Sequence, residues 1–158
     1  MRALIIALFA IVAVAAARTG SSIVVNQGFD PIYLWVVPDV KGSPIGDRIT
    51  LHAGGAWAEQ LHAGRIGNST STIGVAIKVA KDENGLWDGA PLQILAYTLA
   101  GERVCLDAVN GAPFKGQNVR VSSEGAGSIE WPHGEDIGDV TRDNGADRDV
   151  VLVISAKE

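Results

Sequence analysis

Cysteine is the residue type most conspicuously scarce in this chain. The 158 residues contain a single cysteine, Cys105, so no disulfide can form within the chain. Small extracellular domains often rely on disulfides for stability, and here that device is excluded, so a hydrophobic core must hold the fold together. Cys105 stands in the apolar run Val104-Cys105-Leu106, which favours a buried and inert thiol over one that is reactive or pairs between two chains.

Positive charge is scarce as well. Thirteen lysines and arginines stand against eighteen aspartates and glutamates, which gives a net charge of −5. Proteins that bind nucleic acids or anionic membranes through bulk electrostatics need a positive surface. We therefore expect neither nucleic acid nor a membrane among the partners, and we expect a soluble monomer.

The residue patterns that support metal or nucleophilic chemistry are missing too. The three histidines, His52, His62 and His133, are too far apart in sequence for two imidazoles to converge from one strand or helix. Cys105 has no histidine near it, and no Gly-x-Ser-x-Gly elbow occurs. We expect no metal site and no cofactor.

Helical periodicity is absent beyond residue 17, and alternation of period two takes its place. Residues 73–80 show the pattern most clearly, with four aliphatic side chains on one face, as in a half-buried strand. The sequence predicts ten short strands, at residues 23–25, 32–37, 48–51, 56–61, 73–80, 92–99, 104–107, 118–122, 128–131 and 149–154.

Turn-forming pairs separate the predicted strands. Asn84-Gly85, Asn110-Gly111 and Asn144-Gly145 are the clearest, because glycine supplies positive φ and asparagine tolerates it. Ten strands at this spacing predict an all-β fold, a β-sandwich or a related two-sheet structure. Residues 134–148 are acidic and poor in strand signals, which predicts a surface loop or part of a site.

The N-terminus predicts secretion. An uncharged apolar run at residues 3–17 follows Met1 and Arg2, and it ends in three alanines, the pattern of a signal peptide cleaved after Ala17. The run is too short to span a bilayer. We therefore expect residues 1–17 to be the signal peptide and residues 18–158 the mature domain. Asn68 heads the sequon Asn68-Ser69-Thr70, so an N-glycan is expected there.

A series of short segments, in order along nearly the whole mature chain, resembles one family. The segments are residues 23–26 (IVVN), 31–35 (PIYLW), 49–51 with Gly54-Gly55, 74–78 (GVAIK), 89–92 leading to 96–99, Asp107 with 111–114 (GAPF), 128–132 (SIEWP) and 150–154. In these segments the chain resembles the fungal yeast-phase-specific, CetA-like family of secreted proteins, within the osmotin and thaumatin-like superfamily.

The resemblance implies a small, extracellular, thaumatin-like β-sandwich. Members of the family usually carry several cysteines, including one near the position of Gly28, and this chain has none there. No disulfide framework can therefore be carried over. Some members of the superfamily engage glucans in an acidic cleft, but the carboxylates of that cleft do not map residue by residue onto this chain.

Carbohydrate binding needs flat apolar faces beside polar groups, so tryptophan near acidic residues is the pattern sought. Trp131 fits it best, and Trp87, just after Asn84-Gly85, is a second candidate, whereas Trp35 and Trp57 are expected in the core. The candidate ligand-binding residues are Trp131, His133, Glu130, Glu135, Asp136, Trp87 and Asp107.

These observations favour a secreted, non-enzymatic fungal protein that acts at the cell wall or the host interface through glycan or protein binding. The alternative is a weak β-glucan hydrolase, which needs two carboxyl groups facing each other across a cleft. Asp107, Glu130, Glu135, Asp136 and Asp139 are the candidates for such a pair, and no catalytic residue is assigned. A third hypothesis is an effector or antigen that binds a host protein and uses the fold as a scaffold.

Overall fold

The computed structural model describes residues 18–38, 44–65 and 72–156. The predicted signal peptide at residues 1–17 and the predicted glycosylation site at Asn68 lie outside the described residues. Among the described residues, no helix is long and apolar enough to cross a membrane.

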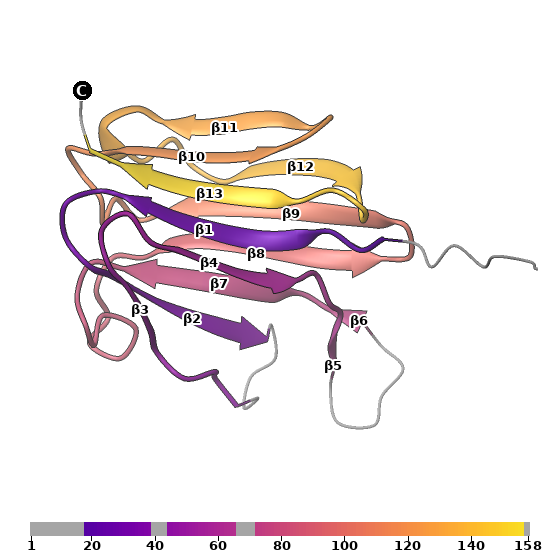
Figure 1. The fold of residues 1–158 in the computed structure, drawn as a ribbon, viewed down its shortest axis with the longest axis horizontal. Coiled ribbons are helices and arrows are strands. Elements are labelled where there is room, and N and C mark those ends of the chain that lie inside the picture. Colours follow the sequence, from indigo (N-terminus) through magenta and orange to yellow (C-terminus); the bar gives the residue numbers. More distant parts are fainter. Residues whose placement is uncertain (1–17, 39–43, 66–71, 157–158) are drawn as a thin grey trace, which may run out of the picture.

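The described chain is built from strands (Figure 1). The strands are β1 (Ser21–Gln27), β2 (Ile32–Pro38), β3 (Ile49–Leu51), β4 (Ala56–Gln60), β5 (Gly64–Arg65), β6 (Thr72–Ile73), β7 (Val75–Ala80), β8 (Gln93–Ala100), β9 (Arg103–Asn110), β10 (Asn118–Ser123), β11 (Gly127–Trp131), β12 (Val140–Gly145) and β13 (Val150–Ser155). A single 3₁₀ turn, η1 (Pro132–Gly134), follows β11.

Two sheets pack face to face. The five-stranded sheet has the order β11-β10-β13-β1-β4, the six-stranded sheet has the order β12-β9-β8-β7-β2-β3, and β5 and β6 form a small ribbon. At the centre of the five-stranded sheet the first and last strands run parallel, with Val24 opposite Leu152. The predicted all-β, thaumatin-like sandwich is confirmed, and all ten predicted strands are present.

Alternating side chains close the space between the sheets. β13 turns Val150, Leu152 and Ile154 inward, and β9 turns Val104, Leu106 and Ala108 inward. These inner faces form one apolar cluster, which also includes Trp131 and Tyr97. A core of this kind replaces the missing disulfides, since each fully buried aliphatic side chain contributes about 1.5–3 kcal/mol.

Two expectations from the sequence are wrong. Residues 134–148 contain strand β12, which pairs with β9 and whose polar side chains are mostly exposed. An edge strand with both faces near solvent shows no alternation, so its sequence lacks the usual signal. The second error concerns Cys105, which is exposed, because the alternation of β9 buries Val104 and Leu106 and turns the thiol outward.

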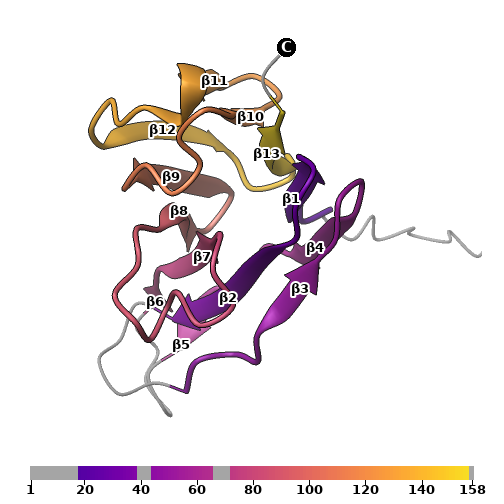
Figure 2. The same cartoon turned by 90° about the vertical axis from the view of Figure 1, so that its left-hand side faces the viewer.

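The strand directions bring five connections to one end of the sandwich, on the left of Figure 1 and facing the viewer in Figure 2. We call this surface the loop end. Its five connections are residues 28–31, 52–55, 81–92, 111–117 and 132–139.

Candidate functional site

The loop end carries the large apolar side chains that the fold leaves in solvent. Phe29 is 85% exposed, Trp87 67% and Ile137 48%, and they are the exposed large hydrophobic residues of the described part of the chain. Each belongs to a different connection, between β1 and β2, between β7 and β8, and between η1 and β12. Single exposed apolar residues are ordinary, but their collection at one end of a sandwich indicates a contact surface.

A buried asparagine fixes the turn that presents Phe29. The Asn26 side-chain amide donates to the carbonyl oxygens of Asp30 and Leu51, both at 2.9 Å, and its Oδ1 accepts from the Gly28 amide at 3.0 Å. Asn26 is fully buried, so these bonds are made away from water and hold the turn rigidly. Phe29 was not predicted, because the sequence pattern expected for a ligand surface was tryptophan beside acidic residues.

Backbone hydrogen bonds shape the connection that presents Trp87. The amides of Gly85 and Trp87 donate to the carbonyl oxygens of Asp82 and Asn84 at 3.0 and 2.8 Å. Arg48 ties the connection to the six-stranded sheet, because its guanidinium lies 2.6 Å from a carboxylate oxygen of Glu83 and packs over the Tyr33 ring. Trp87 therefore lies on an exposed loop, where the sequence placed it.

The connection of residues 132–139, which presents Ile137, also contains His133, Glu135 and Asp136, all exposed. His133 adopts a left-handed φ of 57°, and its backbone amide donates to Asn118 Oδ1 at 3.1 Å. Glu135 lies 3.6 Å from Lys115, and Asp136 accepts from the Gly138 amide at 2.8 Å. The structure thus brings these three predicted residues to the same end as Trp87.

Trp131 is placed differently from the sequence prediction. Its side chain is fully buried in the core, so its ring offers no face to a ligand. The correction follows from the pleat of β11, in which Ile129 and Trp131 point inward and Glu130 points outward. Its indole nitrogen has no hydrogen-bond partner among the described residues. Trp35 is also buried, as predicted, while Trp57 is partly buried against the core.

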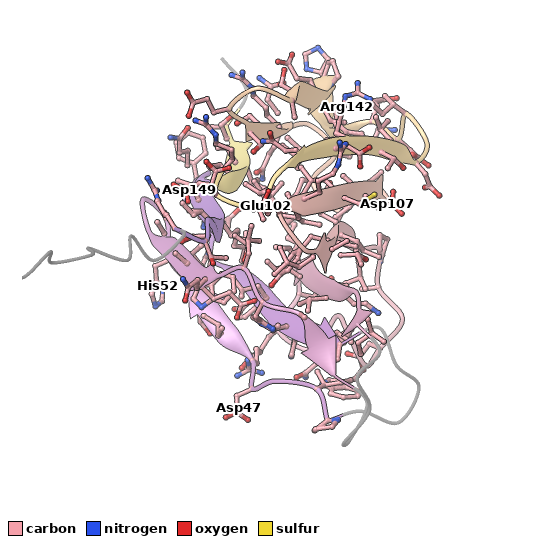
Figure 3. The ribbon with its side chains drawn as sticks, turned by 90° about the vertical axis from the view of Figure 1, so that its right-hand side faces the viewer. Asp47, His52, Glu102, Asp107, Arg142 and Asp149 are labelled. Carbon is pink, nitrogen blue, oxygen red and sulfur yellow. The ribbon has the colours of Figure 1, made fainter. Side chains whose placement is uncertain are left out.

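The candidate carboxylates lie at three places. Glu130 lies on the outer face of the five-stranded sheet, where it pairs with Arg120 at 3.5 Å. Asp107 lies on β9, on the outer face of the six-stranded sheet, on the right of Figure 3. These two carboxylates therefore face away from each other and cannot form the pair that glycoside hydrolysis requires. The other three candidates, Glu135, Asp136 and Asp139, are exposed together on the connection of residues 132–139. Within the described residues, no group of three or more His, Cys, Asp or Glu side chains could hold a metal ion.

Asp107 and Cys105 line a shallow hollow of about 530 Å³ on that outer face. Partial burial, followed by a hydrogen bond with Asp143, raises the pKa of the Cys105 thiol. A thiol that stays protonated is a poor nucleophile. The hollow therefore lacks an activated group for covalent chemistry.

Negative charge surrounds the apolar residues of the loop end. Five of its carboxylates make no ion pair within the described part of the chain: Asp30, Asp82, Asp88, Asp136 and Asp139. The five connections contain two lysines. Lys115 pairs with Glu135, and Lys81 makes no ion pair within the described residues. The loop end thus combines three apolar side chains with five carboxylates that make no ion pair among the described residues.

Comparisons with known proteins agree with this architecture. The family model described as "Blastomyces yeast-phase-specific protein" matches residues 9–156. The protein elicitor MoHrip2 from Magnaporthe oryzae is similar in structure, with a TM-score of 0.64 and 19% identity, over 87% of this chain and 99% of that one. The thaumatin-like xylanase inhibitor TLXI has a TM-score of 0.52 and 8% identity, over 84% and 97% of the two chains. No curated protein sequence matches. At these identities the two structures establish the fold alone.

Proposed function

Because the chain belongs to the family of the Blastomyces yeast-phase-specific protein, we propose that it is a secreted, non-enzymatic, effector-like fungal protein that acts at the cell wall or the host interface. It binds a protein or a glycan there through the loop end. The observation that carries the proposal is the gathering of Phe29, Trp87 and Ile137, all exposed, on three connections at one end of a rigid sandwich.

The proposal of secretion rests on the apolar run at residues 3–17. The proposal of a non-enzymatic role is supported by the placement of Asp107 and Glu130 on opposite outer faces and by the raised pKa of the Cys105 thiol, which disfavours the nucleophilic thiolate. The two structural neighbours, an elicitor and an inhibitor, are compatible with that role.

The shape of the loop end favours a protein over a glycan as its partner. Phe29, Trp87 and Ile137 are 85%, 67% and 48% exposed, so they act as projecting anchors. Strands lie about 4.8 Å apart in a sheet and packed sheets about 10 Å apart. The connections of Ile137 and Phe29 follow β11 and β1, which lie three strand spacings apart in the five-stranded sheet, so these anchors are spread over roughly 15 Å. Such a spread suits a protein interface of standard size.

A triple variant tests the proposal. Phe29→Ser, Trp87→Ser and Ile137→Ser together remove the anchors, and Thr98→Ser, Ala100→Ser and Glu102→Ser form a matched control at and beside the β8–β9 hairpin at the opposite end. Labelled protein is sedimented with washed fungal walls, insoluble β-glucan, chitin and washed host cells, at low and high salt. One portion of the walls and cells is treated with protease beforehand.

We expect the wild type and the control to bind walls or host cells, and the triple variant to bind at least roughly tenfold more weakly, since buried aromatic anchors carry most of an interface's energy. The part of the binding that the triple variant loses identifies the partner of the loop end: its sensitivity to protease treatment identifies a protein, and its loss on β-glucan or chitin identifies a glycan. Equal binding by the triple variant and the wild type on every support would contradict the proposal.

A further inference from the structure

The outer face of the five-stranded sheet holds a second surface, which includes none of the three anchors and reaches the loop end at Pro132. Two hollows of about 680 and 760 Å³ lie on this face along β10, and Arg120 lines both. Each has the size of an ordinary small-ligand site. We call the pair of hollows the sheet groove. At about 3.3 Å per residue, the six residues of β10 extend for roughly 17 Å, so the groove is suited to a short chain rather than to one compact molecule.

Strand register divides this face into a polar half and an apolar half. On the polar side, Arg120 of β10 stands opposite Glu130 of β11, and Ser122 stands opposite Ser128. On the other side of β10, Arg120 and Ser122 stand opposite Val153 and Val151 of β13. Hydrogen-bonding groups and an aliphatic floor therefore run side by side along the groove.

The apolar half continues across β1. Val151 pairs with Ile23 and Val153 pairs with Val25, and all four side chains are partly exposed. A sheet with one solvated face normally alternates apolar and polar residues. Here the outward positions of β1 and β13 are aliphatic instead, which burial in the core does not explain.

The charges of the sheet groove nearly cancel. Arg120 pairs with Glu130 at 3.5 Å, Arg18 pairs with Asp149 at 3.3 Å, and Arg148 pairs with both Glu124 and Asp147. These seven residues are all the charged residues that line the two hollows, three arginines against four carboxylates. An anionic ligand would meet no free positive charge, so charge complementarity favours a neutral ligand over an anionic one.

We infer that the sheet groove binds a neutral, extended oligosaccharide. Such a ligand offers hydroxyl groups to the Arg120, Ser122 and Glu130 side of the groove and C–H groups to the Val151 and Val153 side. The inference goes beyond the proposed function, because it assigns a glycan site to a different face from the loop end.

The test uses the purified protein and three neutral probes, laminarihexaose, chitohexaose and xylohexaose, with affinity measured by calorimetry and the site mapped by amide chemical shifts. Ser122→Trp fills the groove and Arg120→Ala removes its central donor. Thr98→Trp and Arg142→Ala make the same changes at exposed positions of the six-stranded sheet. Thermal melting checks that each variant is folded, and Arg120→Ala, at an exposed position, remains informative if Ser122→Trp does not fold.

We expect at least one probe to bind, with shifts confined to β10, β11 and β13. Both groove variants should lower the affinity for that probe by roughly tenfold or more, and the two control variants should change it by less than about twofold. The affinity should change by less than about twofold between low and high salt, since no ion pair is exchanged. The loop-end triple variant should bind the probe normally, which separates this result from the test of the proposed function.

Three results would overturn the inference: no binding of any probe at millimolar concentration, binding that both groove variants retain, or shifts that map to the loop end. A fourth is self-association that Ser122→Trp abolishes, which would identify the face as an interface between copies of this chain.

Discussion

Asn26 shows how much one buried polar side chain contributes to the loop end. It is fully buried, and its amide group bonds to the backbone of Gly28, Asp30 and Leu51. The turn that presents Phe29 therefore depends on a residue that does not itself reach the surface. Asn26→Ala leaves three backbone groups without their partner and should lower the free energy of unfolding by about 2–4 kcal/mol.

Urea unfolding followed by tryptophan fluorescence measures that cost. Gln60→Ala, at an exposed position on β4, is the control and should change stability by less than about 0.5 kcal/mol. An Asn26→Ala protein as stable as the wild type would show that the turn does not need these bonds.

Gly134 is required by a close approach of two backbones. Its φ is +64°, and a Cβ atom there would lie within 2.1 Å of the Phe114 carbonyl oxygen. Gly138 has a φ of +81° but open space around its Cβ position. We expect Gly134→Ala to destabilise the fold by several kcal/mol, and Gly138→Ala to cost only about 1 kcal/mol from backbone strain. Similar melting temperatures for the two variants would argue against the packing of η1 on Phe114.

Tyr97 predicts an alkaline limit to stability. Burial, followed by the charge of Glu59, raises the pKa of Tyr97 above its ordinary value of 10.0, and the hydroxyl donates to Glu59 at 3.4 Å. The unfolded chain loses this proton at lower pH than the folded chain does, so stability should fall as pH rises above about 10. Chemical denaturation between about pH 9 and 11.5 should show a steep fall for the wild type and for Tyr33→Phe, and a shallower one for Tyr97→Phe. Equal slopes for the two variants would contradict this reading of Tyr97.

Single residues were the hardest part to predict from the sequence. Trp131 has polar neighbours in sequence, which suggested that it lies on the protein surface. It lies two residues after the buried Ile129 on β11, so strand alternation turns it into the core as well. Cys105 lies in an apolar run, yet the same alternation turns it outward. Phe29 stands alone between Gly28 and Asp30, where no periodicity applies, so only the folded turn reveals its exposure.

At the scale of elements, the strands were predictable because most of them bury one face. Period-two alternation and the turn-forming pairs located the ten predicted strands within three residues at each end, although the strand predicted at residues 73–80 joins β7 to the end of β6. β12 was missed because an exposed edge strand carries polar residues on both faces, and the two-residue strands β5 and β6 are too short to show a period. The neighbours of each strand, such as the parallel pairing of β1 with β13, depend on contacts distant in sequence.

The charges of β12 should protect the edge of the six-stranded sheet. Arg142 and Asp143 are exposed on this edge strand, and charged side chains oppose pairing with a second chain. Replacing both with valine should cause self-association, detected by light scattering at concentrations where the wild type is monodisperse. Replacing Lys81 and Asp82 with valine removes the same charges from a loop and should not. Monodisperse behaviour of the β12 variant would show that its charges are not needed for this purpose.

At the scale of the whole molecule, the sandwich is a scaffold that positions the five connections of the loop end. An apolar core without disulfides joins the two sheets, and the strand directions place Phe29, Trp87 and Ile137 at the same end. The carboxylates first considered for catalysis lie at three places on the molecule. Asp107 lies on the outer face of the six-stranded sheet (Figure 3), Glu130 lies on the outer face of the five-stranded sheet, and the other three, Glu135, Asp136 and Asp139, lie on the loop end. Such a distribution supports recognition by loops better than catalysis in a cleft.

Hydrogen–deuterium exchange, compared between the free protein and the protein bound to washed walls or host cells, locates the contact surface directly. The account predicts slower exchange on binding in residues 28–31, 81–92 and 132–139, with no change in the β8–β9 hairpin at the opposite end. Protection of that hairpin while the three loop-end segments stay unchanged would contradict it.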